Sequence, residues 1–173
     1  MNLLDRDRIR RLFEELSEEL ARRGTRAEVF LVGGAAMALA YDARRATRDV
    51  DAVFQPKEEV YAAAAVVAAR HDLPDDWLND GVKGFLPGND PQARSVFEGD
   101  GLRVDVASPQ YLLAMKLLAA REQDVDDIVL LYRLCGFTSA AEGLDLVESV
   151  YPGRAITPKV QFLLEEFFGS TSP

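Results

Sequence analysis

The chain lacks the features that define several protein classes. It has one cysteine, Cys135, which cannot form an internal disulfide and is expected to be a small buried side chain in an apolar helical run. No run of about 18 apolar residues is present, so no transmembrane helix is expected. The first residues, MNLLDRDRIRRLF, carry too many charges for a secretory signal peptide. These absences favour a cytoplasmic protein with no membrane contact.

The chain also has few histidines and no internal repeats, and its composition is that of an ordinary globular domain. The only histidine, His71, lies at the end of a helical pattern beside Asp72 and is expected to be a surface residue. There is no internal repeat, and the only low-complexity stretch is the tail GSTSP. A chain of 173 residues with 48% apolar and 28% charged residues is typical of one soluble globular domain.

Charge is unevenly distributed along the chain. The net charge is −9, which argues against a broad non-specific nucleic-acid binder. Residues 1–48 nevertheless carry 10 Lys/Arg against 8 Asp/Glu, whereas the remaining residues carry 10 against 21. A polyanion would therefore meet mainly the first 48 residues, where RDRIRR, ARRGTR and ARRATR lie. The alternative is that these arginines are only solvated helix faces.

Apolar spacing and turn residues predict a mixed α/β half. The expected elements are a helix over residues 4–23, a strand over 27–32, a Gly33-Gly34 turn, a helix over 35–41, a strand over 49–54, a helix over 57–71, a loop with at most one helical turn over 72–92, and a β-hairpin over 93–107.

The remaining residues predict helices only. Ser108 with Pro109 starts a helix that runs to about Glu122, and Asp124 starts another that ends at Gly136. Ser139 with Glu142 has the capping-box pattern, and Thr157-Pro158 opens the last helix. The expected organisation is an α/β core over residues 1–107 and a helical subdomain over 108–173, packed together as one compact unit.

Three aspartates have the spacing of a metal site. On one strand, Asp49 and Asp51 share a face, with Cβ atoms roughly 6–7 Å apart. Asp105 alternates in the same way with the apolar residues of LRVDVA, so it projects from a second strand. We expect the three carboxylates to converge from neighbouring strands as a hard-oxygen site of the kind that Mg²⁺ prefers.

Two further features suit a phosphate beside this metal. Gly33 and Gly34 let the backbone approach a ligand, and N–H groups at a helix start favour an anion. Lys116, on the apolar face of YLLAMKLLAA, either extends to the edge or reaches a buried anion, with Asp124, Asp126 and Asp127 available to pair with it. Each feature has a structural alternative, namely a backbone turn, a surface Asp pair, a hairpin-edge Asp105 and a solvated lysine.

The order GG, DxD, D and K resembles a known superfamily. VGGAAMALAYDARRATRDVDAVF, LRVDVASPQYLLAMKLLAAREQDVDDI and DDWLND resemble the polymerase-β-like nucleotidyltransferases, and within them the minimal AbiEii/MenT-type toxins of bacterial toxin–antitoxin and phage-defence systems. The similarity spans roughly residues 28–134. It implies an α/β fold with a small mixed sheet flanked by helices.

The resemblance also implies roles for individual residues. Gly33 and Gly34 match the phosphate loop, Asp49 and Asp51 the metal-binding pair, and Asp105 the third carboxylate. Lys116 matches the lysine that steadies the triphosphate, Asp127 matches the acidic residue of the last motif, and Thr47 and Arg48 lie next to the nucleotide. Ala35 stands where many members have Ser, which leaves phosphate binding to backbone N–H groups, Lys116 and Thr47.

The implied reaction is Mg²⁺-dependent nucleotidyl transfer from an NTP, with two metal ions and with Asp105 as the candidate general base. The acceptor implied by the toxin resemblance is the 3′ end of tRNA, and the implied protein partner is a cognate antitoxin. Two alternatives stay open: transfer to a protein or an aminoglycoside-like small molecule, and a catalytically silent fold that only binds a partner.

Overall fold

The computed structural model describes residues 3–42 and 44–169. The chain folds into two compact units. The first unit comprises Met1–Gly84 and Pro91–Ala107, and the second comprises Phe85–Asp90 and Ser108–Pro173. The packing of the helical subdomain on the α/β core, expected from the sequence, stays a prediction.

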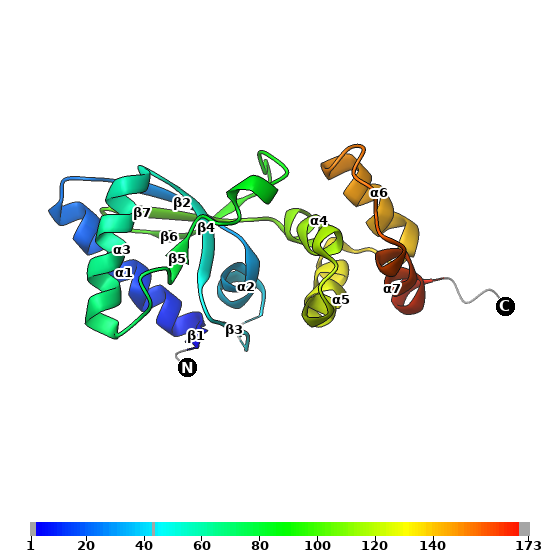
Figure 1. Cartoon of the computed structure of the whole chain (residues 1–173), viewed down its shortest axis with the longest axis horizontal. Helices are drawn as coiled ribbons and strands as arrows, with labels where there is room; N and C mark the ends of the chain where they lie inside the picture. The colour runs from blue at the N-terminus through cyan, green and yellow to red at the C-terminus, as the bar shows by residue number, and fades with distance from the viewer. Residues whose placement is uncertain (1–2, 43, 170–173) are drawn as a thin grey trace. The chain divides into compact units, whose positions relative to one another are not determined.

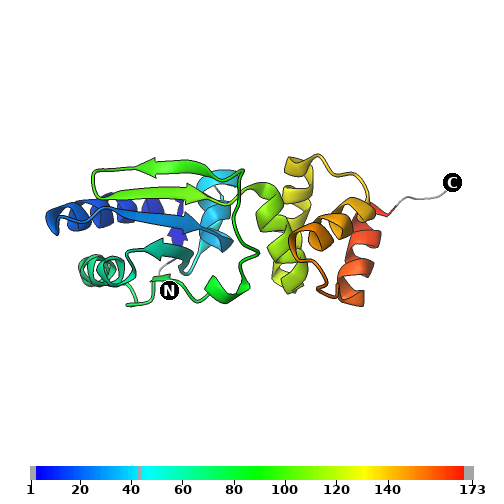
Figure 2. The same cartoon turned by 90° about the horizontal axis from the view of Figure 1, so that it is seen from above.

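The first unit is built on a five-stranded mixed sheet with the order β5-β4-β2-β7-β6 (Figures 1 and 2). The central strand β2 is antiparallel to β4 and parallel to β7. This arrangement confirms the expected α/β class with a small mixed sheet. The strands are β2 (Ala27–Leu31), β4 (Val50–Gln55), β5 (Leu78–Asn79), β6 (Arg94–Glu98) and β7 (Leu102–Val106).

One face of this sheet is apolar and covered by two helices. Buried and less buried residues alternate along β2, β4 and β7, as a half-covered sheet requires. Phe54 of β4 packs edge-on against Tyr61 of α3 (Lys57–His71), with ring centroids 5.0 Å apart. Phe97 of β6 lies 6.2 Å from Phe13 of α1 (Arg6–Arg22), so α1 and α3 cover the same face (Figure 1).

A second, two-stranded sheet was not expected from the sequence. Leu4–Asp5 forms β1, which pairs antiparallel with β3 (Ala46–Thr47). The helix predicted from residue 4 therefore begins at Arg6, because the Asp5 side chain accepts a hydrogen bond from the Arg8 N–H at 2.8 Å and caps it. This pairing joins the N-terminal segment to the residues just before Asp49.

The other differences in the first unit concern short elements. Helix α2 begins at Gly33 and not at residue 35, and a π-helical segment, η1 (Met37–Tyr41), follows α2 (Gly33–Ala36) directly. The segment predicted as a loop contains strand β5 and a short 3-10 helix, η2 (Lys83–Phe85). Trp77 anchors this segment, because it is fully buried and its indole N–H donates to the Ala64 carbonyl at 3.0 Å.

The second unit is helical, as predicted. It contains α4 (Pro109–Ala119), a 3-10 turn η3 (Glu122–Asp124), α5 (Val125–Cys135), α6 (Ala140–Val150) and α7 (Pro158–Phe168). The capping box of Ser139 and Glu142 is present, and Gly136 ends α5 with a φ of 72°. Helix α4 ends before the predicted Glu122, because Ala120 adopts a left-handed conformation with a φ of 51°.

Tyrosine side chains organise this helical unit. The Tyr132 ring stacks on Phe168 at 3.8 Å, which joins α5 to α7. The Tyr111 hydroxyl donates to the Gly88 carbonyl at 2.7 Å, and the Tyr151 hydroxyl donates to the Phe85 carbonyl at 2.9 Å. These two bonds explain why residues 85–90 belong to the helical unit although they precede β6.

Cys135 differs from its predicted environment. It is only half-buried, although burial still raises the pKa of its thiol to about 11. The His71 side chain is 31% exposed, and its Nε2 lies 2.6 Å from a carboxylate oxygen of Glu15 on α1, a pairing that the sequence did not predict. Among the helices described, none is long and apolar enough to span a membrane.

The hairpin turn before β7 allows a direct test of packing in the first unit. A Cβ at Gly101 would overlap the Ser17 carbonyl and lie 2.6 Å from the Ala21 backbone nitrogen. Because backbone atoms of α1 cannot move aside, Gly101→Ala should lower the free energy of unfolding by about 1–3 kcal/mol. Urea denaturation would measure this loss. The control, Gly84→Ala, has open space around it and should change stability by less than about 0.5 kcal/mol; equal effects would contradict the packing.

Candidate active site

The backbone at Gly33 and Gly34 lies directly against two polar side chains. Gly33 has a φ of +66°, and a Cβ there would lie 3.1 Å from Oδ2 of Asp51. A Cβ at Gly34 would lie 2.8 Å from the Thr47 hydroxyl oxygen. Glycine is therefore required twice, once for a left-handed backbone and once for a close approach. The structure thus brings together four of the predicted site residues: Gly33, Gly34, Thr47 and Asp51.

Asp49 and Asp51 do not both belong to a strand. Strand β4 begins at Val50, so Asp49 lies in the bend that precedes it. The expectation that strand alternation places both carboxylates on one face is wrong in this respect. Asp51 is held by the ladder, since its carbonyl accepts the Val32 N–H at 3.0 Å. Asp49 is half-buried, beside the exposed Arg48.

Asp105 projects from the same face of the sheet as Asp51, but not from a neighbouring strand. In register, Asp105 of β7 lies opposite Phe30 of β2, which lies opposite Val53 of β4. Val53 is two residues from Asp51, so both aspartates belong to this less buried face. Because β2 intervenes, β7 and β4 are roughly 10 Å apart. The expectation that these aspartates come from adjacent strands is therefore wrong, whereas the convergence of their carboxylates stays a prediction. The Asp105 carboxylate accepts a hydrogen bond from Nε of Arg103 at 3.0 Å.

The carboxylates near Asp51 are few for a magnesium site made of protein ligands alone. Within residues 3–42 and 44–169, no group of three or more His, Cys, Asp or Glu side chains is arranged to hold a metal ion. Magnesium, however, is usually bound by one or two carboxylates together with substrate phosphates and water. Two carboxylates such as those of Asp49 and Asp51 would meet that smaller requirement, and magnesium binding by this pair stays a prediction. The three-aspartate site stays a prediction, with Asp105 paired to an arginine.

The β1–β3 pairing gathers arginines beside this site. Asp5 lies opposite Ala46, so the start of α1 is next to the segment that contains Arg48. Arg6, Arg11 and Arg48 are exposed, and within the described part of the chain none of them forms an ion pair. We call Arg6, Arg8, Arg10, Arg11, Arg44, Arg45 and Arg48 the arginine surface. Arg48 directly follows Thr47, whose hydroxyl lies against Gly34, so this member of the arginine surface lies next to the glycine turn in the chain.

Lys116 lies in the second unit, between two buried carboxylates. Its ammonium group is 2.7 Å from Asp124 and 3.0 Å from Asp127. The exposed fractions of the three side chains are 11%, 12% and 3%. Of the two expectations for Lys116, a reach to the edge or to a buried anion, the second is confirmed. Asp126 is exposed and takes no part in this cluster.

Comparison with known families decides the identity of the fold. Residues 7–134 match a family model described as "Nucleotidyltransferase of unknown function (DUF6036)". This match covers most of the chain. The chain belongs to this nucleotidyltransferase family. No curated protein and no solved structure matches it.

The match includes every predicted site residue of this nucleotidyltransferase, from Gly33 to Asp127. Helices α6 and α7 lie outside the matched range. The roles of Lys116 and Asp127 toward a triphosphate stay predictions from the resemblance. The assignment to the AbiEii/MenT-type toxins likewise belongs to the proposal below.

Two features of the nucleotidyltransferase were missed by sequence reasoning. Asn79 of β5 lies in register with Asp51, which places it on the same face. The apolar pair Trp77-Leu78 within an acidic segment is the signal that could have revealed this edge strand. The second feature is Arg103, which pairs with Asp105. Alternation alone placed both residues on one face but did not predict their contact.

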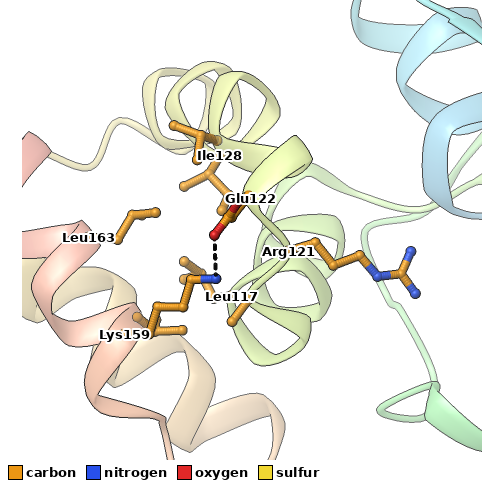
Figure 3. Close-up of a pocket in the computed structure, with 9 residues that line it drawn as sticks. Leu117, Arg121, Glu122, Ile128, Lys159 and Leu163 are labelled. Atoms are coloured by element: carbon orange, nitrogen blue, oxygen red, sulfur yellow. Dashed lines mark hydrogen bonds and ion pairs between the residues drawn. The ribbon is translucent and has the colours of Figure 1, made fainter.

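The second unit of this nucleotidyltransferase also contains an apolar pocket (Figure 3). Its walls include Leu117, Val125, Ile128 and Leu163. Lys159 and Glu122 form an ion pair of 3.4 Å beside it, whereas the Arg121 side chain points away. The pocket lies between α7 and the helices of the family-matched region, and no predicted site residue lines it.

The buried Lys116 cluster predicts a loss of stability on substitution. Lys116→Ala leaves two buried carboxylates without their counter-charge, which should cost about 3–5 kcal/mol. Urea denaturation at neutral pH would measure the loss. Lys159→Ala removes a lysine from an exposed ion pair and should cost less than about 1 kcal/mol. A Lys116→Ala protein as stable as Lys159→Ala would show that the cluster does not stabilise this unit.

Proposed function

We propose that this nucleotidyltransferase transfers a nucleoside monophosphate from an NTP to the 3′-terminal hydroxyl of a tRNA, as the toxin of a toxin–antitoxin pair. The observation that supports the reaction most directly is the contact of the Gly33-Gly34 backbone with Asp51 and Thr47. A metal-binding carboxylate beside a turn without side chains is what a metal-bound triphosphate requires. The toxin role and the antitoxin partner rest on the sequence resemblance.

The nucleotide end of the proposed site uses residues of the first unit. Backbone N–H groups of the Gly33-Gly34 turn would bind phosphate oxygens, and the Thr47 hydroxyl beside Gly34 would donate to one of them. Arg48 adds a positive charge next to Asp49. Asp49 and Asp51 would hold Mg²⁺ together with the triphosphate. The chemistry that magnesium supplies at such a site is neutralisation of phosphate charge and alignment of the attacking and leaving oxygens.

The proposed transfer step exchanges one phosphorus–oxygen bond for another. The oxygen of the acceptor hydroxyl forms a bond to the α-phosphorus of the NTP, and the bond from that phosphorus to the bridging oxygen breaks. Pyrophosphate leaves with the electron pair of that bond, and the hydroxyl proton passes to a base. Asp105, on the same face of the sheet as Asp51, is the proposed acceptor of this proton.

The arginine surface favours a nucleic-acid acceptor over a small molecule. The chain as a whole carries a net charge of −9, yet three exposed arginines of this surface, Arg6, Arg11 and Arg48, form no ion pair in the part of the first unit that the structure describes. Gathering like charges costs free energy unless an anionic partner offsets the repulsion. Phosphates of an RNA acceptor stem would supply that partner.

Asp49→Ala tests the reaction. The substitution should lower nucleotidyl transfer more than about 100-fold, because it removes a ligand from the proposed metal site. The assay is transfer of label from α-labelled NTPs to total RNA in the presence of Mg²⁺. Asp100→Ala, an exposed aspartate in the β6–β7 turn, is the control and should keep full activity.

The outcomes of this assay separate the candidate functions. Label on tRNA, lost in Asp49→Ala while thermal unfolding stays unchanged, supports the proposal. Label on protein or on an added aminoglycoside would replace tRNA as the acceptor. Absence of transfer with every nucleotide and acceptor would refute an enzymatic role. Growth arrest on expression, relieved by a co-expressed neighbouring gene, tests the toxin role.

The double variant Arg6→Gln/Arg48→Gln tests the arginine surface. A plot of log affinity for tRNA against log salt concentration should have a negative slope, and each lost phosphate contact should make that slope shallower by about 0.7–0.9. Fluorescence anisotropy at several salt concentrations measures that slope. Arg133→Gln/Arg154→Gln changes the net charge equally, but in the second unit, and should leave the slope nearly unaltered. Equal effects of both variants would assign the binding to overall charge.

A further inference from the structure

The polar face of the sheet places one arginine among three carboxylates. Arg103 of β7 lies in register with Glu28 of β2 on one side and with Glu98 of β6 on the other. Asp105, two residues further along β7, completes the set. Residues in register share a face of the sheet, so all four side chains project in the same direction.

Arg103 is paired with only one of these carboxylates. Its Nε donates to Asp105 at 3.0 Å, and the two side chains are 46% and 34% exposed. This hydrogen bond is the main reason that the pKa of the guanidinium is raised, and the charges of Glu98 and Glu28 raise it further. Arg103 therefore has alternative acceptors within reach of its own position.

The other two carboxylates have partners of their own. Glu98 pairs with Arg26, which also donates to the Gly99 carbonyl at 2.8 Å. Glu28 accepts a hydrogen bond from the Gln55 amide at 3.4 Å. Asp105 differs from both, because of the three carboxylates it lies closest to Asp51 in the register of the sheet. Arg103 is thus placed to neutralise the carboxylate that the proposed reaction needs.

We propose that Arg103 is an exchangeable counter-ion of Asp105. In the protein without nucleotide it occupies the carboxylate, and on binding of a divalent cation with a nucleotide it moves to Glu28 and Glu98, which releases Asp105. The inference rests on the proposed function, since it assumes a cation at Asp49 and Asp51. Arg103 is a positioning residue, because it acts through Asp105 and not on the reacting atoms.

The physical reason is competition between two cations for one carboxylate. An arginine on Asp105 weakens binding of a nearby divalent cation, both by repulsion and by occupying the oxygens that the cation attracts. Exposure to solvent moderates this effect. Removing the guanidinium should therefore tighten cation binding by about three- to tenfold, and a lysine at the same position should largely preserve the original affinity.

The test measures binding of Mn²⁺ to the full chain by electron paramagnetic resonance, with and without a non-hydrolysable NTP analogue. We expect Arg103→Gln to bind Mn²⁺ about three- to tenfold more tightly than the wild type, and Arg103→Lys to resemble the wild type. Arg133→Gln removes one exposed positive charge from the second unit and leaves Asp105, Glu28 and Glu98 with their partners, so it should change the affinity less than twofold. Thermal unfolding confirms that each variant is folded.

A double variant distinguishes a counter-ion that acts through Asp105 from a general electrostatic effect of the Arg103 charge. If Arg103 acts through Asp105, the gain in affinity disappears in Arg103→Gln/Asp105→Asn relative to Asp105→Asn alone. A gain that persists without Asp105, or an Arg103→Gln affinity within twofold of the wild type, overturns the inference while leaving the proposed function standing. Mn²⁺ binding in the wild type that does not depend on Asp49 overturns both.

Discussion

The close approach of the Gly33-Gly34 backbone to Asp51 and Thr47 is the constraint on which the first unit depends. It requires two residues without a Cβ, one of them in the left-handed region, at the junction of the central strand and a helix. This close approach also requires the start of β4 to lie beside the end of β2. The hydrogen bond from the Val32 N–H to the Asp51 carbonyl holds the two strands in that position. The apolar face beneath α1 and α3 stabilises this junction, and the polar face above it remains available for chemistry.

The two aspartates on this polar face, Asp51 and Asp105, have different electrostatic surroundings. Asp51 meets a glycine turn and Asp105 meets an arginine, although both project from the same face. The short β1–β3 sheet adds positive charge from two segments about 40 residues apart in sequence. A protein of net charge −9 thus presents a local basic surface beside acidic residues. The combination suits a reaction in which a metal-bound triphosphate meets an anionic acceptor.

The helical unit uses charge in a different way. Lys116 is enclosed with Asp124 and Asp127, so its charge is balanced within the unit by groups that are themselves nearly buried. Removal of one member of such a cluster is costly, even where the intact cluster contributes little net stability. The family-matched region ends near the end of α5, and α7 closes it through Tyr132 and Phe168. The added helices thereby cover apolar surface that the matched region leaves open.

Local patterns in the sequence determined most of the elements. Features that depend on neighbours within four residues were predicted. They are the apolar spacing of α1 and α3, the cap at Ser108, the capping box at Ser139 and the end of α5 at Gly136. The order of glycines, aspartates and lysine likewise indicated the nucleotidyltransferase family. Only the tertiary structure decided which strand separates Asp51 from Asp105, that Leu4–Asp5 pairs with Ala46–Thr47, and that Arg103 pairs with Asp105. Strand order and short edge pairings arise from contacts between distant segments, whose free energy is shared across the whole sheet and leaves no periodic signal in any one of them.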